Sequence, residues 1–254
     1  MARFKVGVQF WPQHTNIDAL RDAWKAADAM GVDSIWVWDH FFPLFGPLDG
    51  PHFEGWSLLA AMAADTSQAR LGTLVTCNSY RNPELLADMA RTVDQISSGR
   101  LYLGVGSGWF EPDYEAYGYE FGTALGRLQA FEQALPRIKS RLATVNPAPA
   151  GPLPLLIGGS GEKVTLRIVA EQADAWNAFG PPESYAHKNA VLNDWCAKVG
   201  RDPTEIERTL GMMSTAEIDQ VDDYLEAGAT HLILGLGDPF DLSPVQRLLD
   251  LARD

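Results

Sequence analysis

The stretch Arg70–Val105, RLGTLVTCNSYRNPELLADMARTVDQISSGRLYLGV, predicts one complete strand–helix–strand unit. Residues 70–76 and 100–105 are short apolar runs of the kind that form buried strands. Between them, a loop at residues 77–82 leads to Pro83, and proline is favoured as the first residue of a helix. Strands that alternate with helices in this way are typical of a parallel sheet.

The same alternation extends over the whole chain. Before the quoted stretch, strands are predicted at residues 5–10 and 33–38, with a helix at residues 16–30 that stops at Gly31. After it, strands are predicted at residues 154–157, 174–178, 209–212 and 231–234, the third of which has the weakest signal. Other helices are predicted from about Trp56, over 123–142, up to Gln172, over 185–199, up to Ala227 and after residue 234. Eight strands, each followed by a helix, predict a closed (β/α)₈ TIM barrel.

An open, doubly wound sheet is the alternative architecture. It would leave two sheet edges and need a reversal of strand order that the regular spacing does not indicate. The segment at residues 146–154, NPAPAGPLP, resembles a linker, but a cut there would leave two four-stranded halves that could not close alone. Residues 1–254 are therefore predicted to form a single barrel domain.

Composition limits the class of protein. The 254 residues are 46% hydrophobic, enough for a large core, and the formal charge of −13 disfavours binding to nucleic acid. Two cysteines, Cys77 and Cys196, are too few for a disulfide framework and lack the spacing of a metal site. No apolar run reaches the roughly 18 residues of a membrane span. We expect a soluble cytoplasmic protein with a small-molecule substrate and no metal, nucleic-acid or membrane partner.

The active site of a (β/α)₈ barrel lies at the carboxyl ends of its strands. Here these ends carry glycines, amides, aromatics and one imidazole, but no lysine and no cluster of carboxylates. That disfavours Schiff-base chemistry and two-metal hydrolysis, and suits a planar cofactor held by backbone N–H groups. The candidates are Gln9, Asp39, His40, Cys77, Asn78, residues 106–108, residues 158–161, Trp176, Asn177 and residues 235–237.

Two glycine-rich runs stand out among these ends. In Gly158–Gly161, GGSG, backbone N–H groups can converge on a phosphate at the start of the next helix, with added charge from Lys163 and Arg167. The alternative is a tight turn that needs glycine only for positive φ. The run Gly104–Gly108, GVGSG, is a weak dinucleotide fingerprint, because Trp109 interrupts it and Phe-Glu-Pro follows instead of a helix start. It better suits close approach of the backbone to a flat ring.

Asp39 and His40 close the second predicted strand. Taken alone, a structural explanation is favoured, because an aspartate at a strand end often caps a turn and a lone histidine is more often a satisfied polar residue. Their place at a strand end of a barrel makes them catalytic candidates, since histidine exchanges protons near neutral pH. At other strand ends, Trp38, Trp109 and Trp176 can wall a pocket.

At these residues the sequence resembles the luciferase-like monooxygenase superfamily. Within it, the resemblance is to oxidoreductases that use coenzyme F420, a 5-deazaflavin hydride carrier, and it spans most of the chain in order. It is carried by DSIWVWDHFFP (33–43), LGTLVTCNSYRNPELLADMARTVDQISSGRLYLGVGSGWFEPDYEAYGYEF (71–121), PLLIGGSGEKVTLRIVAEQADAWN (154–177) and GATHLILGLGDPFDL (228–242).

The resemblance implies a deazaflavin or flavin ring at the mouth of the barrel. His40 would exchange a proton with the substrate while hydride moves to or from the ring, and Asp39 would orient His40 or the ring. A bulge, often with a non-proline cis peptide, is implied at about Leu74–Val75. The implied cofactor-binding residues are Val75, Thr76, Cys77, Asn78, Gly106, Ser107, Gly108, Trp109, Gly158, Gly159, Ser160, Gly161 and Trp176.

The sequence also departs from the family pattern. Sugar-phosphate dehydrogenases of the family carry a glutamate directly after the fourth-strand G-x-G, where this chain has Trp109, and this disfavours their reaction. Residues 142–152 and 211–215 are shorter than the pattern, so a compact barrel with shortened loops is predicted. The predicted function is hydride transfer between coenzyme F420 and a small organic substrate, by a homodimer. The alternatives are an FMN-dependent monooxygenase and a cofactor-binding protein without catalysis.

Overall fold

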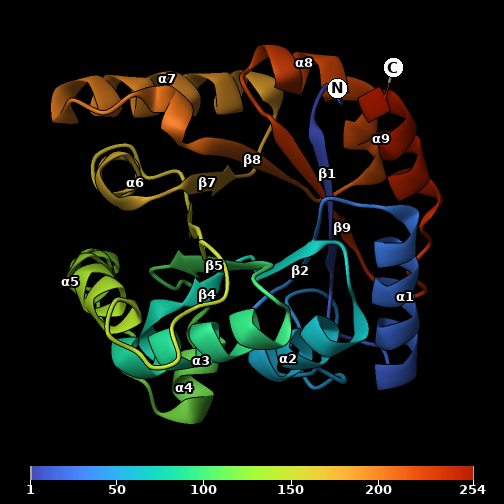
Figure 1. Ribbon diagram of the computed structural model, residues 1–254, viewed down its shortest axis with the longest axis horizontal. Helices are drawn as coiled ribbons and strands as arrows, with labels where there is room; N and C mark the ends of the chain where they lie inside the picture. The colour runs from blue at the N-terminus through green and yellow to red at the C-terminus, as the bar shows by residue number, and fades with distance from the viewer. Residues whose placement is uncertain (1, 254) are drawn as a thin grey trace.

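The computed structural model describes residues 2–253, which form a closed barrel of parallel strands (Figure 1). Neighbouring strands follow the order β3-β2-β1-β9-β8-β7-β6-β5-β4, and an additional pairing of β3 with β5 closes the ring. The predicted (β/α)₈ fold is therefore confirmed. The strands are β1 (Lys5–Phe10), β2 (Ser34–Val37), β3 (Arg70–Thr73), β4 (Thr76–Cys77), β5 (Leu101–Gly106), β6 (Leu155–Gly158), β7 (Ala175–Ala178), β8 (Glu207–Met212) and β9 (His231–Leu236).

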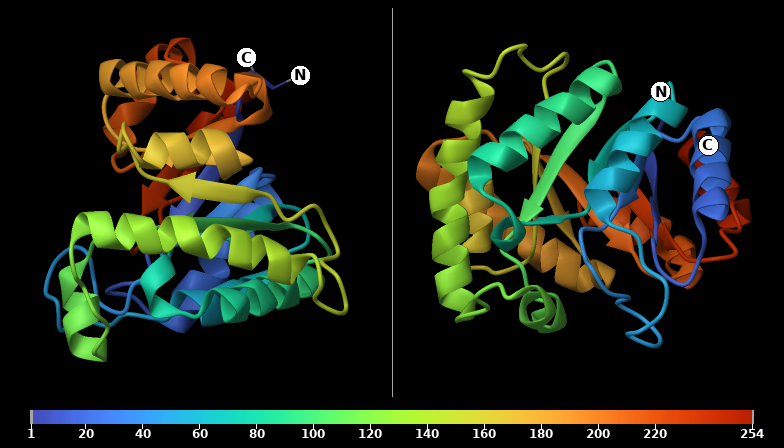
Figure 2. Two further views of the ribbon diagram at one scale, coloured as in Figure 1. Left: turned by 90° about the vertical axis from the view of Figure 1, so that its left-hand side faces the viewer. Right: turned by 90° about the horizontal axis from the view of Figure 1, so that it is seen from below.

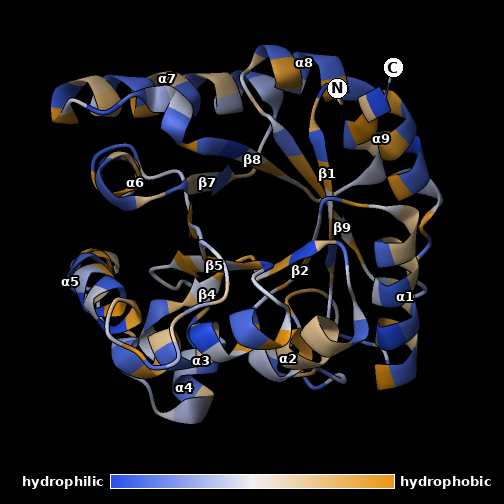
Figure 3. Cartoon of the chain, viewed as in Figure 1, coloured by the Kyte–Doolittle hydropathy of each residue, from blue (hydrophilic) through white to orange (hydrophobic). Residues whose placement is uncertain are grey.

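Helices surround the strands on the outside of the barrel (Figure 1, Figure 2). Each outer helix carries both apolar and polar residues, as expected where one face packs on the barrel and the other meets solvent (Figure 3). No helix within residues 2–253 is long and apolar enough to cross a membrane. The helices are α1 (Ile17–Met30), α2 (Gly55–Asp65), α3 (Pro83–Ile96), α4 (Glu111–Tyr117), α5 (Ala124–Leu142), α6 (Thr165–Gln172), α7 (Pro182–Val199), α8 (Val221–Glu226) and α9 (Ser243–Arg253), with 3₁₀ turns η1 (Asn78–Tyr80), η2 (Pro203–Glu205) and η3 (Thr215–Gln220).

Local signals fix the ends of several elements where the sequence predicts them. The side chain of Asn16 accepts a hydrogen bond from the backbone N–H of Ala19, and Gly31 ends α1 with φ of 82°. Pro83 is the first residue of α3, next to the Asn82 cap. The weakly predicted strand at residues 209–212 is part of β8, which pairs with both β7 and β9.

Two predicted elements differ from the structure. The third strand is not continuous over residues 70–76, because it breaks between β3 and β4 at the cis Leu74–Val75 peptide, which the family resemblance implied at this position. The interpretation that no helix starts after Gly108 is wrong, because α4 begins at Glu111 with Pro112 in its first turn. Proline and acidic side chains are both favoured at that end of a helix, and seven residues are too short to display a periodic apolar pattern.

The barrel has two apolar layers. One lies between strands and helices, and the other fills the interior of the barrel with side chains that include Trp36, Leu74 and Ile233. Gly72 on β3 allows this inner packing, because a Cβ there would lie 2.4 Å from the Trp36 ring. A side chain at Gly72 would therefore collide with the largest residue of the inner layer.

A buried polar network closes the amino-terminal end of the barrel. The carboxylate of Glu207 accepts hydrogen bonds from Lys5 Nζ (2.8 Å), Tyr102 Oη (2.7 Å) and His231 Nδ1 (3.2 Å). Ser34 Oγ lies 2.7 Å from the other ring nitrogen of His231. Lys5, Ser34, Glu207 and His231 are each the first residue of a strand. The network therefore ties β1, β2, β5, β8 and β9 together at one level.

Replacing Glu207 with Gln is expected to destabilise the barrel by about 2–3 kcal/mol, because charge-assisted hydrogen bonds in a largely buried site are lost. Burial opposes ionisation of Glu207, but His231, Lys5 and Tyr102 outweigh it and hold its pKa far below the usual range. This stabilisation is complete above the ordinary glutamate pKa of 4.5 and is lost as the pH falls further. In chemical denaturation, the difference in stability between parent and variant should therefore shrink below pH 4.5.

Glu205→Gln, at an exposed ion pair with Arg201, is the matched control and should change the free energy of unfolding little. Equal effects of the two substitutions would contradict the account.

Candidate functional site

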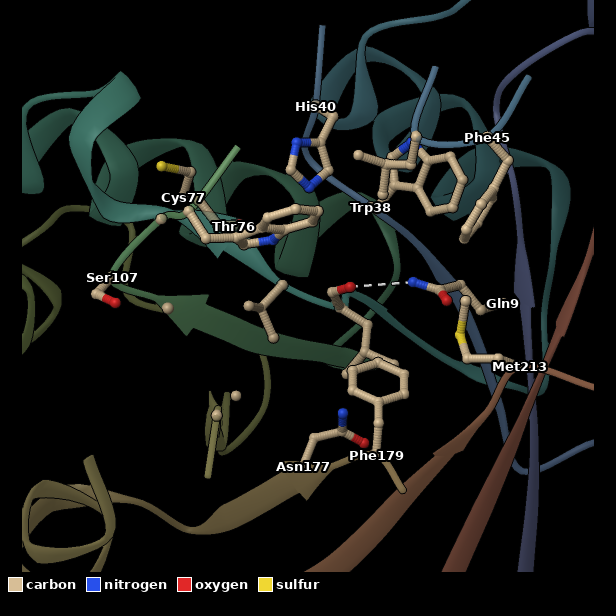
Figure 4. Close-up of a pocket in the computed structure, with 18 residues that line it drawn as sticks. Gln9, Trp38, His40, Phe45, Thr76, Cys77, Ser107, Asn177, Phe179 and Met213 are labelled. Carbon is tan, nitrogen blue, oxygen red and sulfur yellow. Dashed lines mark hydrogen bonds between the residues drawn. The ribbon is translucent and has the colours of Figure 1, made fainter. Parts of the chain in front are cut away.

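A cavity of about 510 Å³ opens at the carboxyl ends of the strands (Figure 4). This volume lies within the roughly 300–1,000 Å³ of typical ligand pockets. No Lys, Arg, Asp or Glu is among the residues that line it. The lining residues are Gln9, Trp38, His40, Leu44, Phe45, Leu74, Val75, Thr76, Cys77, Gly106, Ser107, Gly108, Trp109, Gly158, Gly159, Asn177, Phe179 and Met213.

The structure brings most of the predicted site residues together in this cavity. His40 lines it with the predicted residues of β3–β4, β5 and the first half of the GGSG loop. Five predicted residues lie outside the lining: Asp39, Asn78, Ser160, Gly161 and Trp176. Gln9 and Asn177, which were strand-end candidates only, do line it.

The floor of the cavity is built around Val75. A Cβ at Gly106 would lie 2.8 Å from Val75 Cγ2, and one at Gly158 would lie 3.0 Å from Val75 Cγ1. Gln9 Nε2 donates a 3.0 Å hydrogen bond to the carbonyl of Leu74, which fixes the chain just before Val75 (Figure 4). The result is an apolar floor at Val75, beside the glycine ends of β5 and β6, which carry no side chain there.

His40 is held from behind by Asp113, a residue of α4. His40 Nδ1 lies 2.7 Å from Asp113 Oδ2, and the carboxylate is fully buried. Asp113 also accepts hydrogen bonds from the backbone N–H of Phe41 (3.0 Å) and from Tyr80 Oη (2.7 Å). Asp113 was not among the predicted site residues. The only local signal for its helix was the proline and acidic residues at the start of α4.

Asp39 points away from the cavity and is fully buried. Arg81 donates to both of its oxygens at 2.6 and 2.9 Å, and the backbone N–H of Cys77 donates at 3.1 Å. Arg81 also donates to Glu54, whose side chain caps α2. Asp39 therefore joins the end of β2 to β4 and α2, and it is Asp113 that contacts His40.

The aromatic wall beside His40 comes from the loop after β2. Trp38 Nε1 donates to His52 Nε2 at 2.9 Å, and burial lowers the pKa of His52 to about 4, so this acceptor stays neutral. Gln13 Oε1 accepts from the backbone N–H groups of Leu44 and Phe45. Buried Gln13 and partly buried His52 thus fix the loop that presents Phe45, for which the sequence held no periodic signal.

Cys77 lies at the edge of the cavity as a thiol. Its Sγ is 3.2 Å from Tyr114 Oη, and burial raises the pKa of the thiol. A thiolate is therefore disfavoured at neutral pH, as expected for a packing residue and not a nucleophile.

Some backbone groups of the Gly158–Gly161 loop are already hydrogen-bonded within the protein. Gly159 has φ of 127°, its N–H donates to the Asn177 carbonyl, and its carbonyl accepts from Trp176 Nε1 at 2.8 Å. Trp176 is fully buried and stacks on Tyr185, so it supports the loop from behind. The predicted phosphate ligand Arg167 instead pairs with Glu132 and Glu171. Lys163 is exposed beside the loop and remains the charged candidate for contact with a phosphate.

A comparison with known families and structures agrees with this architecture. A family model described as luciferase-like monooxygenase matches residues 4–247. A phthiodiolone/phenolphthiodiolone dimycocerosates ketoreductase of Mycobacterium tuberculosis is 28% identical over 248 residues, which cover 82% of this chain and 64% of the relative. The chain thus spans less than two thirds of that relative's length.

Two solved structures share the fold at low sequence identity. One is an F420-dependent secondary alcohol dehydrogenase in complex with an F420–acetone adduct, with a TM-score of 0.87, 16% identity and coverage of 99% of this chain and 100% of that one. The other is the oxygenating constituent of 3,6-diketocamphane monooxygenase from Pseudomonas putida in complex with FMN, with a TM-score of 0.74, 13% identity and coverage of 99% and 97%.

Replacing Arg81 with Met is expected to destabilise the protein by about 3–5 kcal/mol, because Asp39 would lose its charged partner in a buried site. Burial raises the pKa of Asp39, while Arg81 favours its ionised form. Thermal or chemical unfolding measures the effect. Arg137→Met is the matched control, since Arg137 pairs with Glu84 at the surface and its loss should cost no more than about 1 kcal/mol. Similar stability of the two variants would rule out a structural role for the Asp39–Arg81 pair.

Proposed function

The chain belongs to the luciferase-like monooxygenase family, and on that premise we propose that it transfers hydride between a deazaflavin coenzyme and a small uncharged carbonyl or alcohol substrate. The observation that carries the proposal is the position of His40. Its imidazole is the one titratable side chain, besides the thiol of Cys77, among the lining residues of an apolar cavity. A proton carrier beside a ring site suits hydride chemistry coupled to proton transfer.

The residues of the cavity fit a flat ring. Val75, Gly106 and Gly158 form a floor on which a side chain at position 106 or 158 would intrude, and Ser107 and Asn177 are polar residues of the lining. When bound, a reduced deazaflavin supplies a hydride. The Gly158–Gly161 loop, with Lys163 beside it, is the proposed site for the phosphate of the coenzyme.

The apolar walls of the cavity suit an uncharged substrate. Trp38 and Phe45 face the cavity from one side and Phe179 from the other (Figure 4), and Leu44 and Met213 also line it. The lining residues include no fixed charge to pair with a carboxylate or phosphate group of a substrate. Burial of such a charge without a partner is costly, so a ketone, an aldehyde or the corresponding alcohol is favoured.

His40 then supplies the proton. In the reducing direction the carbonyl carbon receives the hydride, and the carbonyl oxygen takes a proton from the imidazolium of His40. In the oxidising direction the neutral imidazole accepts the proton of the alcohol. The ketoreductase relative and the structural neighbour that carries an acetone adduct support a carbonyl or alcohol as the substrate.

An FMN-dependent monooxygenase is the second candidate, since one structural neighbour is a Baeyer–Villiger monooxygenase that contains FMN. The two candidates differ in the coenzyme they need. Homodimerisation remains a prediction in either case.

Titration of the protein with coenzyme F420 and with FMN is expected to quench the fluorescence of the deazaflavin at micromolar coenzyme, with weaker or no binding of FMN. Gly106→Ala should weaken binding of the deazaflavin by about tenfold or more, because the added methyl group would clash with Val75 on the floor where the ring is proposed to lie. Gly126→Ala, on the exposed side of α5, is the matched control. Tight binding of FMN without binding of the deazaflavin would contradict the proposal and favour the monooxygenase.

Replacing His40 with Ala is expected to lower kcat for ketone reduction by about 10²–10⁴-fold, because the carbonyl oxygen loses its proton donor. The Kd for the deazaflavin should stay within about threefold of the parent, since the floor and the loop are unchanged. Steady-state kinetics and the fluorescence titration measure the two quantities separately. Parent protein that binds coenzyme but reduces no ketone or aldehyde would favour a binding protein without catalysis.

A further inference from the structure

We propose that Asp113 is a positioning residue that holds the proton of neutral His40 on Nδ1, so that Nε2 is the atom that exchanges a proton with the substrate. The inference rests on the proposed function and assigns the proton transfer of that reaction to one atom of His40. His40 Nδ1 lies 2.7 Å from Asp113 Oδ2. The other ring nitrogen of His40 is directed to the cavity (Figure 4).

The surroundings of Asp113 require a donor at Nδ1. The backbone N–H of Phe41 and the hydroxyl of Tyr80 both donate to the carboxylate, so Asp113 acts as an acceptor on each side. Burial raises the pKa of Tyr80, which keeps its phenol protonated as a donor. An ionised carboxylate accepts hydrogen bonds and donates none, so the bond to His40 is complete only when Nδ1 carries a proton.

The same carboxylate also sets the direction of the ring. Its two oxygens contact the side chain of His40 and the backbone of the next residue, Phe41. Asp113 lies in the first turn of α4, which directly follows the cavity residues Gly108 and Trp109. One short helix therefore connects the rim of the cavity to the back of the imidazole.

Proton balance follows from this arrangement. During ketone reduction the hydride forms a C–H bond at the carbonyl carbon, the π electron pair moves to the oxygen, and the oxygen takes the Nε2 proton of the imidazolium. His40 is then neutral with its proton on Nδ1, which is the tautomer that Asp113 accepts from. A proton from solvent restores the imidazolium, and alcohol oxidation runs through the same atoms in reverse.

Replacing Asp113 with Asn is expected to invert the tautomer. The single side-chain oxygen of the amide is needed by the N–H of Phe41, which leaves the NH₂ group to face Nδ1 of His40 and Tyr80. Nδ1 must then accept, and the proton of neutral His40 moves to Nε2. An equivalent exchange in catalytic triads lowers kcat by about 10⁴-fold, so a loss of about 10²–10⁴-fold is expected here.

The test is ¹⁵N NMR of protein with labelled histidine, without coenzyme, at a pH raised until the His40 shifts no longer change, with the His40 signals identified by their absence in His40→Ala. In the parent protein, Nδ1 should show the shift of a protonated ring nitrogen and Nε2 that of an unprotonated one. The assignment should be reversed in Asp113→Asn, while the Kd for the deazaflavin stays within about threefold and kcat falls. Tyr80→Phe removes a donor to the same carboxylate and should keep the parent tautomer.

A parent protein in which Nε2 carries the proton of neutral His40 would overturn the inference, whether or not Asp113→Asn folds. An unchanged tautomer in folded Asp113→Asn, or a full kcat despite inversion, would also overturn it. Failure of the proposed function has a different signature. In that case the tautomers follow the expectation, but neither parent nor variant binds a deazaflavin or reduces a ketone.

Discussion

The structure depends on one steric constraint, which is that an eight-stranded barrel has an interior only wide enough to be filled by side chains. At the break between β3 and β4, the chain lies so close to β5 that a Cβ at Gly104 would be 1.9 Å from the Thr73 carbonyl oxygen. Val75 then occupies the space that side chains at Gly106 and Gly158 would need. Packing of the barrel alone therefore requires these glycines, and the floor of the cavity, with no side chain besides Val75 at these positions, is a consequence of that packing.

The two ends of the barrel use their polar residues in opposite ways. At the amino-terminal end, Glu207 and His231 bond each other and partners from three further strands, so the network is closed and stabilises the fold. At the carboxyl-terminal end, His40 is bonded on one side only, by Asp113, and its other side meets the cavity. A histidine and a carboxylate are thus enclosed by partners at one end, whereas at the other end the histidine faces an open cavity and only its carboxylate is enclosed.

The sequence predicted the barrel because each strand and most helices carry local signals, such as the Asn16 cap, Gly31 and Pro83. It also predicted that His40 and the glycine-rich strand ends would meet, since strand ends share one rim of a barrel. It could not predict that Asp113 contacts His40, because that pair is 73 positions apart and α4 is too short for a periodic pattern. Nor could it show that Asp39, next to His40 in the chain, turns to Arg81, since the direction of a buried side chain depends on residues far along the sequence.

In the proposed complex, a deazaflavin ring lies on the floor formed by Val75, Gly106 and Gly158, with its reactive face toward His40. A crystal structure of the protein with coenzyme F420 bound measures this position directly. We expect ring density over Val75, Nε2 of His40 on the side where substrate enters, and phosphate density at residues 158–161. Ring density elsewhere, or a ring whose reactive face is turned away from His40, would contradict it.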